Sequence, residues 1–263
     1  MRKYLALAHA EMLDAVQEKA EVFIWMLITV IPVFVMTSVW TTNQYQVAGL
    51  NISQLITYYL IVVFLSWVTD FWFDEHMGEE IRTGGFSRFL LRPLTFPFAF
   101  IFQNLGRKMF SIPIFLIPTA LVISLLFKDH FIFPNRTSFL IFVAAALVSF
   151  GIRFTMSVFA ASGAFWWEQS SALIHLKWVL EVLAGGYMLP ISLYPDWLQF
   201  IPRSLPFQFI YYVPVSVWNG TISPSAAASM LLTGFIWFII LLIASSWLWN
   251  KGVKQYSAVG DKG

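Results

Sequence analysis

Six apolar runs, each long enough to cross a bilayer as a helix, constrain this chain more than any other feature. A helix rises about 1.5 Å per residue, so about 20 apolar residues span a hydrocarbon layer about 30 Å thick. Only 11% of the residues are charged, against roughly 25% in soluble domains, so lipid is the solvent. We therefore predict an all-α membrane protein with one transmembrane domain over residues 1–263. The runs occupy residues 21–40, 54–73, 104–127, 138–162, 171–190 and 226–249.

Residues 1–19 predict a different kind of helix. Leu5, Ala8, Met12 and Val16 recur at near-helical spacing, with charged residues between them. This pattern is typical of an amphipathic helix that lies in the plane of the membrane interface. Acidic residues interrupt the segment, so we do not predict a signal peptide.

Lysine and arginine collect in alternate connections, and short basic loops remain on the cytoplasmic side. We therefore predict a cytoplasmic (inner) membrane protein with both termini and the 74–103 loop in the cytoplasm. The formal net charge of +2 is too small to suggest a nucleic-acid partner. The residues on the predicted cytoplasmic side are Arg2, Lys3, Lys19, Arg82, Arg88, Arg92, Arg107, Lys108, Lys177, Lys251, Lys254 and Lys262, and those on the opposite side are Lys128, Arg136 and Arg203.

The 74–103 loop carries the densest charge in the chain. A charged stretch precedes Gly84-Gly85, after which apolar residues alternate with Arg88 and Arg92 until Pro93 ends the predicted helix. A short helix of this kind is suited to dock into a groove on a soluble partner. A solvated loop whose leucines reach the lipid headgroups explains the same pattern, and both interpretations stay open.

The block EEIRTGGFSRFLLRPL in this loop, after an amphipathic helix and two spans, resembles the permease subunits of bacterial ATP-binding-cassette exporters of the type-two (ABC-2-like) class. The closest likeness is to the six-span subgroup, in which an ATPase works with two related permeases. The resemblance implies two copies of an ATPase subunit, which bind ATP and Mg²⁺, and a second permease that is identical or related. No cofactor is expected on this chain. The resemblance assigns ATPase coupling to Glu79, Glu80, Ile81, Arg82, Gly84, Phe86, Arg88, Leu91, Arg92 and Pro93.

Six of the twelve prolines lie between residues 190 and 224. Together with Gly185-Gly186 they predict short broken helices near the outer end of the fifth run, which a membrane tolerates only where protein or water satisfies the freed backbone groups. The resemblance implies that residues 191–220 form an external re-entrant hairpin that serves as the outer gate. A proline-rich external loop without a gating role is the alternative. The predicted gate residues are Pro190, Pro195, Trp197, Pro202 and Pro206.

Charges inside the apolar runs need partners, because each costs about 2.5–3.5 kcal/mol or more at the bilayer centre. Lys177 and Glu181 share a helix face, and Arg153 lies at a comparable depth, so we predict a cluster of the three. It could be a structural clamp or a polar pathway. Asp70 and Asp74 lie close to the predicted inner interface, where Arg or Lys of the same loop can pair with them. The four histidines are scattered along the sequence, so no metal site is predicted.

The function predicted from these patterns is export of an unidentified substrate by alternating access. The sequence lacks G-x-x-x-x-G-K-[ST], so ATP hydrolysis is expected on a separate subunit and this chain is expected to be non-catalytic. Two alternatives remain. One is a membrane-embedded transferase that binds Mg²⁺ through Asp70-x-x-x-Asp74, although such chemistry needs a second acidic motif. The other is a non-transporting membrane scaffold.

Overall fold

The structure is a computed structural model, and it describes residues 2–18, 20, 23–24, 27–28, 31, 35, 38, 50–71, 73–91, 96, 98–126, 128–167 and 171–256. The regular elements in these residues are all helical. Most of the first predicted run, at 21–40, and the predicted coupling residues Arg92 and Pro93 lie outside the described residues. The elements are α1 (Arg2–Gln17), α3 (Ile52–Thr69), α4 (Phe73–Arg82), α5 (Phe86–Leu90), α6 (Phe98–Ser111), η1 (Ile112–Leu116), α7 (Ile117–Leu126), α8 (Arg136–Ser162), η2 (Gly163–Phe165), α9 (Ser171–Ala184), η3 (Ile191–Leu193), α10 (Asp196–Ser204), η4 (Pro206–Phe209), α11 (Tyr212–Trp218) and α12 (Pro224–Gln255).

Three segments within the described residues are long and apolar enough to cross a membrane: Ile52–Arg82, Arg136–Phe165 and Pro224–Gln255. Two other predicted runs are helical but interrupted. α6, η1 and α7 follow one another from Phe98 to Leu126, and η1 is a π-helical turn that contains Pro113, which has no backbone N–H to donate. α9 has 14 residues and so reaches only about 21 Å, less than the hydrocarbon thickness.

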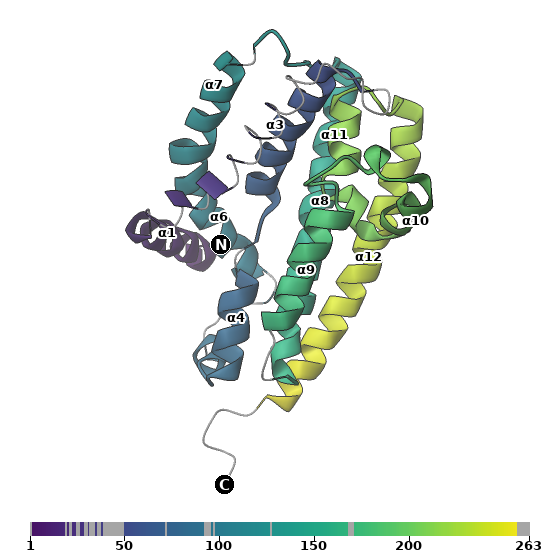
Figure 1. Ribbon diagram of the computed structural model, residues 1–263. Helices are drawn as coiled ribbons and strands as arrows, with labels where there is room; N and C mark the ends of the chain where they lie inside the picture. Colours follow the sequence, from purple (N-terminus) through teal and green to yellow (C-terminus); the bar gives the residue numbers. More distant parts are fainter. Residues whose placement is uncertain are drawn as a thin grey trace.

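α8 lies at the centre of a helical bundle, where it packs along α12 and also contacts α11, α9 and α3 (Figure 1). Caps define where these helices begin. The Asn51 side chain accepts the backbone N–H of Gln54 at the start of α3, and Asn135 does the same for Ser138 at the start of α8. The main core cluster includes Tyr58, Leu65, Ile152, Ile210 and Val215, which are all buried.

α1 lies across the direction of the bundle helices and packs on α6 (Figure 1). The contact is close because Gly106 has no side chain; an added Cβ would stand 2.1 Å from the carbonyl oxygen of Ala8. Gln103 donates to Glu11 at 2.7 Å, and Arg107 pairs with Glu18 at 2.6 Å. The segment predicted to be an amphipathic helix is thus helical over Arg2–Gln17, and both backbone proximity and polar contacts hold it on α6.

The segment after α9 consists of short helical pieces at the end of the bundle away from α4 (Figure 1). Gly186 adopts φ +85°, a conformation that glycine reaches at low cost, and the chain turns there. The freed carbonyl groups find donors on α3, because Tyr58 donates to Gly186 at 2.5 Å and Tyr59 donates to Met188 at 3.2 Å. The break is thus satisfied by protein, as a break at membrane depth requires.

An aromatic cluster fixes the opposite end of the bundle. Phe86 of α5 is fully buried there, with its ring edge-to-face against Trp249 and Tyr256 at centroid distances of 5.6 and 5.2 Å. Phe96 stacks on Trp249 at 4.4 Å. Aromatic pairs of this geometry add about 0.5–1.5 kcal/mol each beyond burial. The cluster therefore binds α5 to the C-terminal end of α12.

Candidate functional site

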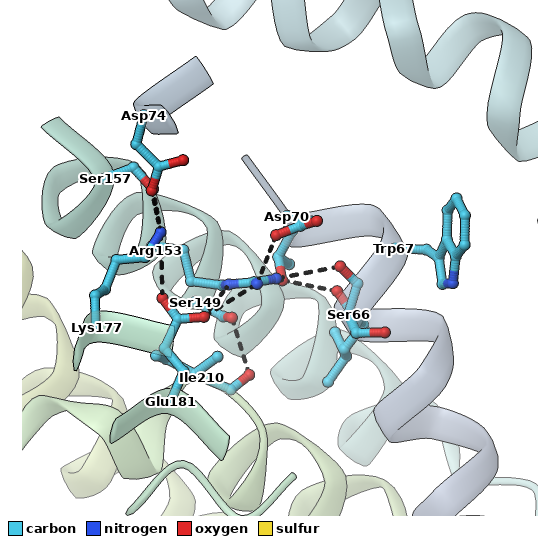
Figure 2. Close-up of polar contacts among 12 residues, drawn as sticks. Ser66, Trp67, Asp70, Asp74, Ser149, Arg153, Ser157, Lys177, Glu181 and Ile210 are labelled. Atoms are coloured by element: carbon cyan, nitrogen blue, oxygen red, sulfur yellow. Dashed lines mark hydrogen bonds and ion pairs between the residues drawn. The ribbon is translucent and has the colours of Figure 1, made fainter. Parts of the chain in front are cut away.

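Arg153 of α8 stands at the centre of a charge cluster (Figure 2). Its guanidinium is 2.7 Å from Asp70 Oδ1 and 3.1 Å from Glu181 Oε2. It also donates to the carbonyl oxygen of Ser66 and to the hydroxyl of Thr69, both at 3.1 Å. Arg153 is only 6% exposed, and its planar set of donors suits several acceptors at once.

Lys177 of α9 forms the second half of the cluster. Its ammonium group donates to Asp74 and, at 2.9 Å, to Ser157 of α8. Glu181, one turn further along α9, has Oε1 at 3.9 Å from the same ammonium group. The cluster therefore connects four helices: α3 ends at Asp70, α4 holds Asp74, α8 holds Arg153, and α9 holds both Lys177 and Glu181.

The break between α3 and α4 places the two aspartates. Asp70 is the C-cap residue of α3 in an extended conformation, with φ −67° and ψ 153°, so the helix ends there. Asp74 lies in the first turn of α4, where a negative charge interacts favourably with the helix dipole. One carboxylate is thus directed to α8 and the other to α9.

Lys108 of α6 completes the charge balance. Lys108 is 8% exposed, and its ammonium group donates to the carbonyl oxygens of Trp67 and Asp70, at 2.7 and 2.8 Å. Asn104 donates to the same Asp70 carbonyl at 2.8 Å. These contacts satisfy the last carbonyl groups of α3, and a cation at that end also interacts favourably with the helix dipole. With Lys108 included, three basic and three acidic residues face one another.

The structure brings together the predicted group of Arg153, Lys177 and Glu181. The expectation that Asp70 and Asp74 pair within their own loop is wrong, since their partners are Arg153 and Lys177. Lysine and arginine side chains of the loop can be hydrated by water and do not need the aspartates. The buried cations Arg153 and Lys177 would be destabilising without a nearby carboxylate. Sequence reasoning also missed Lys108, although its i, i+4 spacing to Asn104 on a helix with mostly apolar neighbours was an available signal.

The arrangement bears directly on the transferase alternative. Both carboxylates of Asp70-x-x-x-Asp74 are engaged by buried cations, and they contact different helices. A Mg²⁺ ion bound by this pair would have to displace Arg153 and Lys177. The geometry therefore fits a charge-balanced clamp better than a metal-binding pair.

The predicted coupling residues of α4 and α5 divide into two groups. Ile81 and Phe86 are 5% and 0% exposed and belong to the aromatic cluster, so their side chains cannot contact a partner in this conformation. Gly84 has φ +84° and turns the chain between the two helices. Glu80 is partly exposed, and its carboxylate is 3.7 Å from Arg88. The exposed members are Glu79, Arg82, Arg88 and Leu91.

The predicted gate residues also divide. Pro190, Pro202 and Pro206 are buried, whereas Pro195 and Trp197 are exposed, Trp197 by 78%. α10 therefore presents Trp197 away from the bundle. α10, which carries Trp197, lies away from α4 along the bundle (Figure 1).

A family model described as ABC-2 family transporter protein matches residues 22–260. No curated protein and no solved structure matches the chain. The family is a membrane component of transporters and is typically non-catalytic, and it implies partnership with an ATP-binding subunit. The match spans nearly the whole chain and agrees with the long apolar helices, so the protein belongs to the ABC-2 transporter family and is a multi-pass membrane permease of an ABC transporter.

Proposed function

We propose that this permease exports its substrate outward across the cytoplasmic membrane, driven by a separate ATPase that docks on the α4–α5 segment. The proposal rests on which side chains of that segment are exposed and which are buried. Arg82, Arg88 and Leu91 are exposed, while Ile81 and Phe86 are buried in the aromatic cluster. A surface anchored in this way is suited to receive a force and pass it to the bundle.

The position of the segment supports the same function. α4 extends beyond α1 at the end of the bundle where α12 finishes (Figure 1). α1 has the amphipathic character of an interfacial helix, so the end of α4 would project from the membrane into the cytoplasm. Both termini would then be cytoplasmic, in agreement with the distribution of lysine and arginine.

The transport cycle that we propose is alternating access. Two ATPase subunits, which hold ATP and Mg²⁺, close and push α4 and α5. The bundle then rearranges against a second permease, either another copy of this chain or a related subunit. The α10 region, with Trp197 and the buried prolines, serves as the outer gate.

The test is to purify the tagged protein gently from its native membrane, identify the proteins that co-purify, and assay ATP hydrolysis. Recovery of a P-loop ATPase supports the proposal, and a second permease in the same sample would distinguish a heterodimer from a homodimer. Recovery of the chain alone, without ATPase activity, would favour the transferase or scaffold alternatives.

A charge reversal locates the docking surface. Arg88→Glu changes an exposed side chain of α5 whose pair with Glu80 is long, so the fold should be unaffected. Lys254→Glu is the matched control, because Lys254 is also exposed and lies at the same end of the bundle. ATPase recovery should fall with Arg88→Glu and remain with Lys254→Glu. Equal recovery from both variants would show that α5 is not the docking surface.

A further inference from the structure

Lys177 is paired with two carboxylates, and only one of them accepts a hydrogen bond from it. Its ammonium group donates to Asp74 and to Ser157, while Glu181 Oε1 is 3.9 Å away, beyond hydrogen-bond distance. Figure 2 shows the ammonium group between the Asp74 and Glu181 carboxylates. A shift of about 1 Å toward Glu181 would form a charge-assisted hydrogen bond of ordinary length.

Glu181 Oε1 has no hydrogen-bond partner among the described residues, although Glu181 is only 2% exposed. Its other oxygen, Oε2, accepts from Arg153 at 3.2 Å. An unsatisfied buried acceptor is costly, by more when it carries charge. In this conformation Glu181 Oε1 therefore accepts no hydrogen bond from the described part of the chain, although the Lys177 ammonium group, which donates to Asp74, lies close to it.

The two acceptors differ in the helix that carries them. Glu181 is on α9, four residues after Lys177, so one helix sets the spacing of their backbones. Asp74 is on α4, which continues toward the exposed α5 surface. Movement of α4 thus changes the distance between Lys177 and Asp74, while the backbones of Lys177 and Glu181 keep their spacing on α9.

We propose that Lys177 is a two-position switch, which binds Asp74 in this conformation and transfers to Glu181 Oε1 when α4 moves away from α9. The exchange gives up the ion pair with Asp74, shortens the existing pair with Glu181 to a hydrogen bond, and lets Asp74 become hydrated. Such an exchange keeps the two states close in free energy, as a two-state element requires. The cause of the movement rests on the proposed function; the exchange itself does not.

The exchange can be tested on the purified full-length chain without any ATPase. Lys177→Met and Glu181→Gln are made singly and together, in the wild-type and in the Asp74→Asn background, and thermal unfolding midpoints are measured. Glu181→Gln also perturbs the contact between Arg153 and residue 181, but it does so equally in both backgrounds. This effect therefore cancels from the coupling between residues 177 and 181. The coupling between residues 177 and 181 should be larger in Asp74→Asn than in the wild type, by about 2–4 °C. Equal coupling in the two backgrounds overturns the switch.

Glu75→Gln supplies the matched background. Glu75 neighbours Asp74 in the first turn of α4, but its side chain is exposed. The same loss of one negative charge there should leave the coupling between residues 177 and 181 at its wild-type value. An increase with Glu75→Gln would mean that general electrostatics, rather than release from Asp74, controls the pair, and this too would overturn the switch.

A second measurement uses spin labels and does not require a Lys177 variant. The chain has no cysteine, so His76→Cys on α4 and His175→Cys on α9, both exposed, can be labelled specifically. In the complex with its co-purified ATPase, ATP with orthovanadate should change the label distance. Glu181→Gln should reduce the population of the new distance, because Lys177 then lacks its second carboxylate. An unchanged population in Glu181→Gln would contradict the switch.

The two experiments separate the switch from the proposed function. Stronger coupling in Asp74→Asn, with a label distance that nucleotide does not alter, would support the local exchange and contradict ATP-driven movement of α4. Coupling that is independent of Asp74, with a label distance that nucleotide does alter, would support the transporter mechanism and refute the switch.

Discussion

The hydroxyl of Tyr58 donates to the carbonyl oxygen of Gly186 at 2.5 Å, deep in the bundle and 128 residues apart in sequence. This bond joins α3 to the point where the chain leaves α9. It satisfies a carbonyl group that the end of α9 leaves without a helical partner. The outer broken-helix segment is therefore held in place by α3, the same helix that ends at the charge cluster.

Tyr58→Phe should lower the stability of the outer segment. The variant keeps the ring but leaves the buried Gly186 carbonyl without its donor, at a cost of about 1–3 kcal/mol. Thermal unfolding of the purified protein measures the change. Tyr194→Phe is the control, because Tyr194 donates to the Leu183 carbonyl at the same distance but at an exposed position, where water can replace it. Equal losses in the two variants would contradict this account.

Gly186→Ala should destabilise the protein more than Gly220→Ala. Both glycines have positive φ, +85° and +69°, so alanine adds backbone strain of about 1–2 kcal/mol at either position. At Gly186 the new Cβ would also stand 2.7 Å from the Tyr58 hydroxyl, whereas at Gly220 no atom lies within 4 Å. The difference between their unfolding midpoints measures the clash alone. A Gly220→Ala loss as large as that of Gly186→Ala would exclude a steric contribution.

Arg153→Met should destabilise the bundle by about 3–5 kcal/mol. The change leaves Asp70 and Glu181 without their common cation, and breaking a buried pair from one side leaves an uncompensated charge. Arg136→Gln is the control, because Arg136 is exposed at the start of α8. Thermal unfolding again provides the measurement. A fully stable Arg153→Met protein that is inactive in transport would favour a polar pathway over a clamp.

Gly106→Ala should separate α1 from α6. The added methyl group would meet the backbone of Ala8, which cannot move without moving the helix. Hydrogen exchange should become faster in α1, while protection of α8 and α12 stays the same. Met109→Ala, at a position that is 62% exposed on α6, should leave α1 protected. Unchanged exchange in Gly106→Ala would show that the close backbone contact is not needed for docking.

The anchoring of α5 could not be predicted from the sequence. Phe86, Arg88 and Leu91 lie within six residues, and a helix of 5 residues is too short for its periodicity to indicate which side faces the protein. The aromatic rings that enclose Phe86 come from Trp249 and Tyr256, more than 160 residues later. The sequence prediction therefore placed the whole coupling block on one contact surface, although the fold buries Phe86 and exposes Arg88 and Leu91.

The amino-acid sequence is enough to establish that lipid surrounds the chain, that it is helical, and that its intramembrane charges need partners. Apolar runs of about 20 residues can be stable in lipid only as helices, and a buried Arg153 or Glu181 requires an opposite charge whatever the packing. Which charges meet depends on how the helices pack. Asp70 and Asp74 reach different helices because α3 ends at Asp70, and Lys108 takes part because α6 passes the end of α3. Pairing energy depends on distance and burial, and three-dimensional packing alone sets both.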